Sequence, residues 1–294
     1  MLLIIQGILS GIPAGVTYGL MGFSIALIFR TTGVMNFAIG HCGMMGVFFG
    51  WMILGFTNSL PLAILSGVVF GWILGVVIER FLMRPINNMS HGGMLIITLG
   101  LLFIFTDAAM LIWGTEAYPF PEIYAGAPLI FNTSAQPIII SANDVALTIV
   151  GLVLSVILAL ILGYTKIGIA SRARAQDVIG ARVVGINTDR IDMIAWSAGI
   201  AIAVIVGFLV APKESVQPNM LLNLLIFGLV ACVLGGFGSP FGAIAGGLVL
   251  GVLEKVATVF VPVDYRLAII LFIVIAVLVL KPSGIFAKHV KTRA

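Results

Sequence analysis

Long apolar runs dominate the chain, and short stretches between them carry most of the charged residues. Several runs reach the roughly 20 residues that a helix needs to cross a bilayer core of about 30 Å. They are continuous rather than alternating, which excludes a transmembrane β-barrel. The pattern predicts membrane-spanning helices at 3–29, 34–57, 60–78, 92–113, 145–163, 193–212, 220–237, 241–260 and 267–280.

Two stretches interrupt this pattern. The first run contains GIPAG (11–15), where Pro13 removes a helical hydrogen bond, so we expect residues 2–11 to form a separate half-helix at the membrane surface. The stretch 114–142 holds several prolines and two β-like segments, PLIF and PIII, around NTSAQ. It predicts a small extracytoplasmic hairpin.

Composition strengthens the membrane prediction. The chain is 61% hydrophobic and only 9% charged, whereas a soluble domain is about 25% charged. A water-soluble fold is therefore excluded. We expect an all-α polytopic membrane protein with about 8–9 transmembrane helices and a single domain over residues 1–294.

Charge sets the expected orientation, because lysine and arginine favour cytoplasmic loops. Placing 166–190 in the cytoplasm puts 114–142 outside. All but three of the 15 lysines and arginines then lie inside, the exceptions being Lys213, Lys255 and Arg266. A chain that skipped 220–237 would place its basic tail outside, so we expect nine crossings, or eight plus a broken segment near 220–240.

The stretch SRARAQDVIGARVVGINTDR (171–190) concentrates charge in an otherwise apolar chain. Asp177 can cap a short helix over 178–184, and Gly185 can end it. Asp189 and Asp192 are candidate caps for the next membrane helix. The short helix would carry an apolar strip suited to docking another protein, formed by Val178, Ile179, Ala181 and Val184. The simpler alternative is an ordinary basic cytoplasmic loop.

Two segments, 66–80 and 241–255, share glycine spacing and an acid–base pair at their ends. They run in opposite senses in the topology above, as in the inverted repeats of many transporters. Chance similarity between glycine-rich helices is the alternative. The pairs Gly242/Gly246 and Gly247/Gly251 also have the small-xxx-small spacing of close helix contacts.

Polar residues inside apolar spans are costly, so they are candidates for the solute path. These are Asn36, His41, Asp107 and Asn223. For each, the alternative is a packed, hydrogen-bonded helix contact. The sequence contains no GxxxxGK[ST], HExxH or GxSxG pattern and no paired cysteines, so we expect no nucleotide, metal or catalytic site in this chain.

Residues 171–190 resemble the cytoplasmic coupling segment of permeases in the branched-chain amino-acid ABC importer family, with the pattern R-A-x-x-x-D/N-x-x-x-A-x-x-x-G-I-N. GVMNFAIGHCGMMG (33–46) is similar to the family's I-N-F-A-H-G-E-x-x-M-x-G. VLGGFGSPFGAIAGGLVLGVLE (233–254) and LVLKPSGIF (278–286) also resemble family motifs. The early motif departs from the family, since Ile39 and His41 stand where His then Glu are common, and this puts the solute in doubt.

The resemblance implies a multi-pass subunit of a bacterial inner membrane. It would receive a small solute from a periplasmic binding protein, with branched-chain amino acids first among the candidates and related small polar metabolites next. Two cytoplasmic ATPase subunits would use the ATP, and a second related permease or another copy would complete the pore. No cofactor, catalytic role or nucleic-acid partner is expected. The ATPase-coupling candidates are Arg174, Asp177, Val178, Ala181, Arg182, Gly185, Ile186 and Asn187.

Other classes of function remain open at this point. A secondary transporter or channel would use intramembrane carboxylates, and Asp107 is the one deep candidate. A purely structural membrane subunit or an intramembrane enzyme is a further alternative. The sequence leaves open the solute, the pairing of permeases and the form of residues 220–240.

Overall fold

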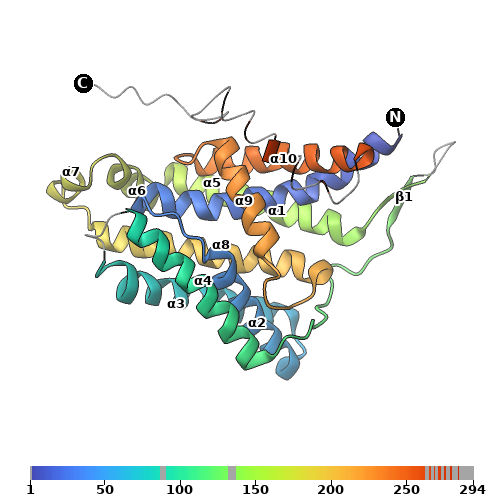
Figure 1. Ribbon diagram of the computed structural model, residues 1–294, viewed down its shortest axis with the longest axis horizontal. Coiled ribbons are helices and arrows are strands. Elements are labelled where there is room, and N and C mark those ends of the chain that lie inside the picture. The colour runs from blue at the N-terminus through green and yellow to red at the C-terminus, as the bar shows by residue number, and fades with distance from the viewer. Residues whose placement is uncertain are drawn as a thin grey trace.

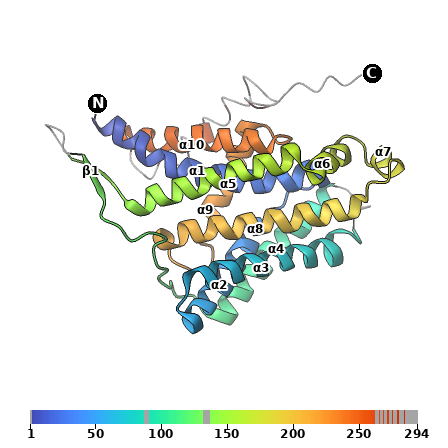
Figure 2. The same ribbon diagram turned by 180° about the vertical axis from the view of Figure 1, so that it is seen from behind.

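The structure is a computed structural model that describes residues 2–86, 91–131 and 137–261, together with 265, 268, 271, 272, 275, 279 and 284. Among these residues, seven helices are long and apolar enough to cross a membrane, and they run broadly along one axis (Figures 1 and 2). They are α1 (Leu2–Thr32), α2 (Ile39–Thr57), α3 (Leu60–Val77) with its π-helical continuation η1 (Ile78–Met83), α4 (His91–Trp113), α5 (Ala142–Tyr164), α8 (Thr188–Glu214) and α10 (Pro240–Phe260). The predicted all-α polytopic membrane class is confirmed.

The remaining helices are shorter: α6 (Lys166–Gln176), α7 (Val178–Val183) and α9 (Leu222–Gly235). With 14 residues, α9 is about 21 Å long, too short for a bilayer core of about 30 Å. It lies crosswise to the long helices in Figure 1. Residues 220–240 therefore form a short helix rather than a full span. The expected span at 267–280 lies outside the described residues, apart from isolated positions.

The predicted hairpin is present. Strands β1 (Leu129–Phe131) and β2 (Ile138–Ile140) pair antiparallel, with Leu129 opposite Ile140. They lie at the end of the bundle that holds the N-terminus, opposite α7 (Figures 1 and 2). Ahead of β1, the backbones of Tyr118 and Val216 exchange two hydrogen bonds of 2.8 and 2.9 Å. The loop is thus anchored to the chain that leaves α8.

The expected break at GIPAG is wrong, because α1 runs unbroken through Pro13. On this helix, Gly11, Gly15 and Gly19 lie directly against the backbone of α10. A Cβ atom at Gly15 would come within 2.7 Å of the Leu248 Cα atom. This continuous contact along α10 holds the helix together where proline removes a hydrogen bond.

The glycines of α10 serve two neighbours. Gly247 and Gly251 lie against α1, whereas Gly242 and Gly246 lie against the backbone of α9. Both small-xxx-small pairs therefore make close helix contacts, as predicted from their spacing.

Helices α3 and α10, which carry the two segments of the predicted inverted repeat, have corresponding neighbours. Helix α1 packs along α9 and α10, and α8 packs along α2 and α3. Helices α3 and α10 run in opposite directions (Figure 1). A non-helical segment follows each crossing helix, 33–38 after α1 and 215–221 after α8. The matched acids Glu79 and Glu254 are both buried.

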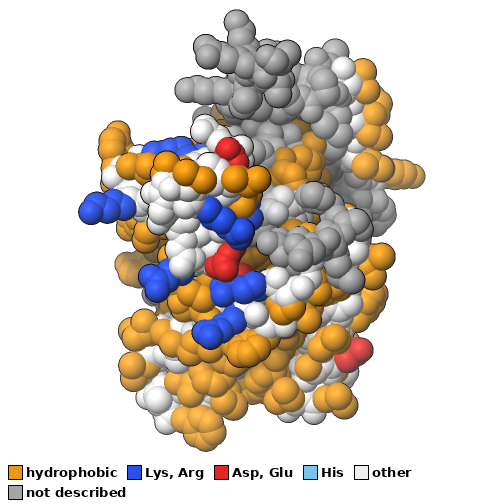
Figure 3. Space-filling model, turned by 90° about the vertical axis from the view of Figure 1, so that its left-hand side faces the viewer, with side chains coloured by type: hydrophobic (Ala, Val, Ile, Leu, Met, Phe, Trp, Pro, Cys, Tyr) orange, Lys and Arg blue, Asp and Glu red, His pale blue; other side chains and the backbone are white. Residues whose placement is uncertain are grey.

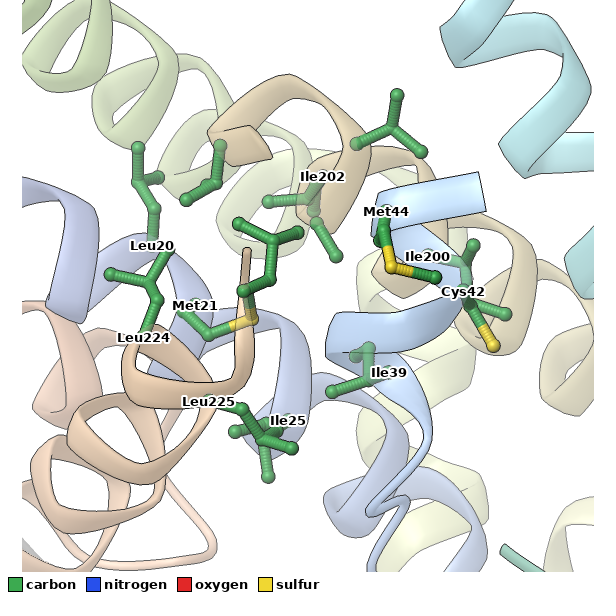
Figure 4. Close-up of a cluster of buried hydrophobic side chains, with 14 of the residues drawn as sticks. Leu20, Met21, Ile25, Ile39, Cys42, Met44, Ile200, Ile202, Leu224 and Leu225 are labelled. Carbon is green, nitrogen blue, oxygen red and sulfur yellow. The ribbon is translucent and has the colours of Figure 1, made fainter. Parts of the chain in front are cut away.

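The apolar core lies where these helices cross. Side chains from α1, α2, α8 and α9 meet there, as Figure 4 shows for Leu20, Met21, Ile25, Ile39, Cys42, Met44, Ile200, Ile202, Leu224 and Leu225. Cys42 and Cys232 are both buried and free. They act as small core residues.

Placing a large side chain at the α1–α10 contact tests this packing. We expect Gly251→Leu to destabilise the protein by about 1–3 kcal/mol or more, because the new side chain meets the α1 backbone. Gly100→Leu on α4 is the matched control, since no neighbouring atom lies within 4 Å of a Cβ there. The measurement is the melting temperature of the detergent-solubilised protein. Equal melting temperatures for the two variants would show that the glycine contact is dispensable.

Candidate functional site

Lysine and arginine side chains gather on the end of the bundle that carries α6 and α7, together with a few acids (Figure 3). This end lies opposite the N-terminus and the hairpin (Figure 1). The basic end is therefore the one expected to face the cytoplasm.

Side-chain caps fix the starts of the two short helices within residues 166–190, which we call the coupling segment after its predicted role. The Thr165 side chain accepts a hydrogen bond from the Gly168 backbone and begins α6. The Asp177 side chain accepts from the Ile179 backbone at 2.9 Å and begins α7, as predicted. Gly185 has a φ of +84°, which favours glycine, and ends the helix. The following Ile186 N–H donates to the Ala181 carbonyl at 2.9 Å, which fixes the turn.

The predicted caps of α8 are wrong. Asn187 caps this helix, its side chain accepting a hydrogen bond from the Arg190 backbone at 3.0 Å. Asp189 and Asp192 lie within the helix and pair with arginines instead. Arg174 of α6 pairs with Asp192, and Arg182 of α7 pairs with Asp189. Sequence spacing alone does not show these contacts.

Arg174 is buried and links α6 to α8. Its Nε and Nη2 atoms donate to the two carboxylate oxygens of Asp192 at 3.0 and 2.9 Å, and only 8% of the residue is exposed. Arg182 donates to the Thr188 hydroxyl at 2.8 Å and pairs with Asp189 at 3.3 Å. Both arginines are among the predicted ATPase-coupling residues, and the structure gives each an internal partner.

A third arginine joins the same network. Arg84 forms a two-pronged pair with Glu79 at 2.8 and 3.1 Å, and donates to the Asp189 carbonyl at 3.2 Å. The hydrogen bonding that Arg84 donates to the Glu79 carboxylate raises the pKa of Arg84 above its ordinary value, so this guanidinium stays charged. The coupling segment is thus tied to α8 and, through α8, to the end of α3.

The exposed surface of α7 differs in part from the predicted strip. Ala181 is 3% exposed and faces inward, so it contributes nothing to a docking surface. Ile179, Val183 and Val184 are exposed by 75%, 81% and 73%. We call these three residues the α7 face.

Two of the predicted path residues lie deep in the bundle. Asn36 is in the non-helical segment 33–38, His41 is in the first turn of α2, and each is 1% exposed. The Asn36 side-chain oxygen accepts from the Ala38 backbone at 2.9 Å, while its amide nitrogen has no hydrogen-bond partner in the structure. Non-helical backbone at membrane depth is characteristic of transporter paths.

Sequence analysis missed the partner of His41. The His41 Nε2 atom lies 3.2 Å from the Asn219 side-chain oxygen, and its Nδ1 atom has no hydrogen-bond partner. Asn219 lies in the segment 215–221 and has a φ of +70°. The turn sequence Gln-Pro-Asn was the available signal. The structure thus brings the first turn of α2 against the non-helical segment that follows α8.

The other two path candidates lie elsewhere. Asn223 is exposed and lines a cavity of about 310 Å³ between α1, α5, α8 and α9. Asp107 is exposed on α4 and does not line this cavity. The four candidates therefore do not form one cluster. Within the described part of the chain, no group of three histidine, cysteine or acidic residues is placed to hold a metal ion.

Comparison with known proteins decides the family. The profile of the family described as "Branched-chain amino acid transport system / permease component" matches residues 7–278. The chain belongs to this permease family. The permease is 28% identical to the high-affinity branched-chain amino acid transport system permease protein LivH of Salmonella typhimurium, over 97% of this chain and 96% of that protein. It is 26% identical to BraD of Pseudomonas aeruginosa over the same shares.

A more distant relative is the autoinducer 2 import system permease protein LsrC of Yersinia pseudotuberculosis, 28% identical over 69% of this chain and 55% of that protein. No solved structure matches the permease significantly. The permease is a transmembrane subunit of an ATP-binding-cassette importer and resides in the inner membrane.

The buried Arg174–Asp192 pair gives a stability prediction. We expect Arg174→Ala to cost about 3–5 kcal/mol, because it leaves the Asp192 carboxylate buried without its partner. Arg182→Ala should cost about 0–1 kcal/mol, since the Arg182 and Asp189 side chains are 58% and 49% exposed. Thermal unfolding of the purified permease measures both. Similar losses for the two variants would count against the bracing role of Arg174.

The His41–Asn219 contact gives a transport prediction. We expect His41→Ala to alter uptake or solute preference without loss of the assembled complex, because the contact joins the first turn of α2 to the non-helical segment that follows α8. Asn219→Ala should have the same effect. The measurement is uptake against a panel of amino acids and short amides. Unchanged uptake across the panel would return His41 to a packing role.

Proposed function

We propose that the permease passes a branched-chain amino acid, or a related small polar metabolite, from a periplasmic binding protein into the cytoplasm. The names of LivH and BraD support the first solute class. The name of LsrC supports the wider class, since that relative belongs to an autoinducer 2 import system. A small zwitterionic or polar solute also suits a bundle that buries the Asn36 amide and the His41 imidazole.

The α7 face is the observation that carries the proposed coupling. Its three large apolar side chains stand exposed on a short helix at the basic end of the bundle. An exposed apolar patch with a polar rim is suited to a protein partner. We assign this partner as a cytoplasmic ATPase subunit, with one on each of two permeases.

The remaining predicted coupling residues hold α7 in place, so that the α7 face stays exposed. Asp177 caps α7, and Gly185 with Ile186 forms the turn that ends it. Arg174 and Arg182 hold the segment against α8. Because the segment is rigid, little conformational entropy is lost when a partner binds it. Val178 is half-buried and Ala181 buried, so both support α7 from inside.

The proposed importer needs further subunits beside this permease, each with its own role. ATP is bound and hydrolysed by the ATPase subunits, and the permease itself is non-catalytic. A second permease, related or identical, completes the membrane part. The binding protein meets the end that carries the β1–β2 hairpin, opposite α7. A secondary transporter is the weaker alternative, because Asp107 is exposed on α4 rather than facing the cavity.

Charged substitutions on the α7 face test the coupling. We expect Ile179→Asp and Val183→Asp to reduce co-purification of the ATPase at least tenfold and to abolish uptake, because an apolar contact gains an unpaired charge. Ile130→Asp on the hairpin is the matched control. Ile130 is 56% exposed and lies at the opposite end, so its variant should retain the ATPase.

Membrane insertion of each variant is checked by its yield in the purified membrane fraction. If both α7 variants retain ATPase and uptake at the wild-type level, the segment is an ordinary basic loop and the coupling proposal is wrong.

A further inference from the structure

The outer cavity of about 310 Å³ combines charges of both signs with an apolar wall. Its size is at the lower end of the range for small-molecule pockets, about 300–1,000 Å³. It lies between α1, α5, α8 and α9, at the end of the bundle away from α7. Its lining includes Asp144, Leu147, Lys213, Glu214, Leu224 and Lys255.

The charges are balanced. Lys213 at the end of α8 forms an ion pair with Asp144 at the start of α5. The Lys255 Nζ atom on α10 lies 3.6 Å from the Oε1 atom of the buried Glu254. The Glu254 Oε2 atom accepts a hydrogen bond from the Tyr18 hydroxyl at 2.8 Å. Glu214 lines the same cavity and is exposed. The lining therefore offers two ammonium groups and two carboxylates.

The apolar wall lies beside these charges. Leu147 and Leu224 are buried and line the cavity. The rings of Tyr18 and Phe227 also line it, with their centroids 4.7 Å apart. A ligand that fits all of these groups is small, carries one charge of each sign, and has an aliphatic or short polar side chain.

We propose that this cavity binds the zwitterionic head group of an α-amino acid on its way into the membrane. The solute carboxylate pairs with Lys213 and Lys255, and its ammonium group pairs with Asp144 and Glu214. The proposal rests on the proposed function, because it names the site that receives the solute from the binding protein.

The balance of charges favours a zwitterion over an anion. Asp144 pairs with Lys213, and the Asp144 side chain is 18% exposed. A zwitterion can replace both halves of this pair, so that each charge keeps a partner while water is excluded. A simple anion that paired with Lys213 would leave the Asp144 carboxylate, which is largely buried, without its partner, and this is costly.

The first test uses the complete importer in proteoliposomes with its loaded binding protein. We expect Lys213→Gln and Glu214→Gln to lower leucine uptake at least tenfold at saturating binding protein. Stimulation of ATPase activity by the binding protein should change less than twofold, which shows that the complex is assembled. Glu122→Gln is the matched control, an exposed acid of the outer loop that does not line the cavity.

The second test asks for the ligand class. Ser10 is exposed and lines the cavity, so Ser10→Cys provides a label site, while Cys42 and Cys232 are buried. Without binding protein, L-leucine should slow labelling by a thiol reagent at least threefold. Leucinamide, which lacks the carboxylate, and 4-methylpentanoate, which lacks the ammonium group, should not.

The outcomes separate the two proposals. If the wild-type complex takes up no branched-chain amino acid or related small polar metabolite, the proposed function fails. If it takes up leucine and the cavity variants match Glu122→Gln, the cavity proposal alone is overturned. Equal protection by all three compounds would also overturn the zwitterion site.

Discussion

Backbone contact between α1 and α10 is the interaction on which the rest of the structure depends. Lipid supplies no hydrophobic drive for helices to associate, so close van der Waals packing must hold them together. The glycines of α1 and α10 permit that approach, and Gly75 of α3 does the same against α8, where an added Cβ would lie 2.5 Å from the Ser197 Cα atom. Each half of the chain thus sends its first helix against the other half.

These helix crossings bury His41 deep in the bundle next to Asn219, and leave the arginine–aspartate pairs at the start of α8. The first turn of α2 meets the non-helical segment that follows α8 through His41 and Asn219. Helix α8 begins at the coupling segment and ends at the rim of the outer cavity, over 27 residues or about 40 Å. Arg174 and Arg182 tie α6 and α7 to its first turns. If α7 docks an ATPase as we propose, α8 connects that contact directly to Lys213 at the cavity.

Sequence reasoning succeeded where local chemistry decides the structure. The apolar runs, the proline-bounded hairpin, and α7 between Asp177 and Gly185 all follow from residues close in the chain. It failed where distant neighbours decide. Pro13 stays helical because α10 packs along it, Ala181 faces inward, and Asp192 serves Arg174 rather than the helix start. The His41–Asn219 contact joins residues 178 positions apart, which no local pattern reveals.

Site-specific photo-crosslinking tests the central proposal, which is that α7 contacts an ATPase subunit and so couples ATP hydrolysis to the bundle. A benzophenone side chain placed at Val183, in membranes containing the complete importer, should capture an ATPase subunit in high yield. The same group at Ile130, exposed at the opposite end, should capture none. Capture of the ATPase from both positions, or from neither while the complex remains assembled, would contradict the account.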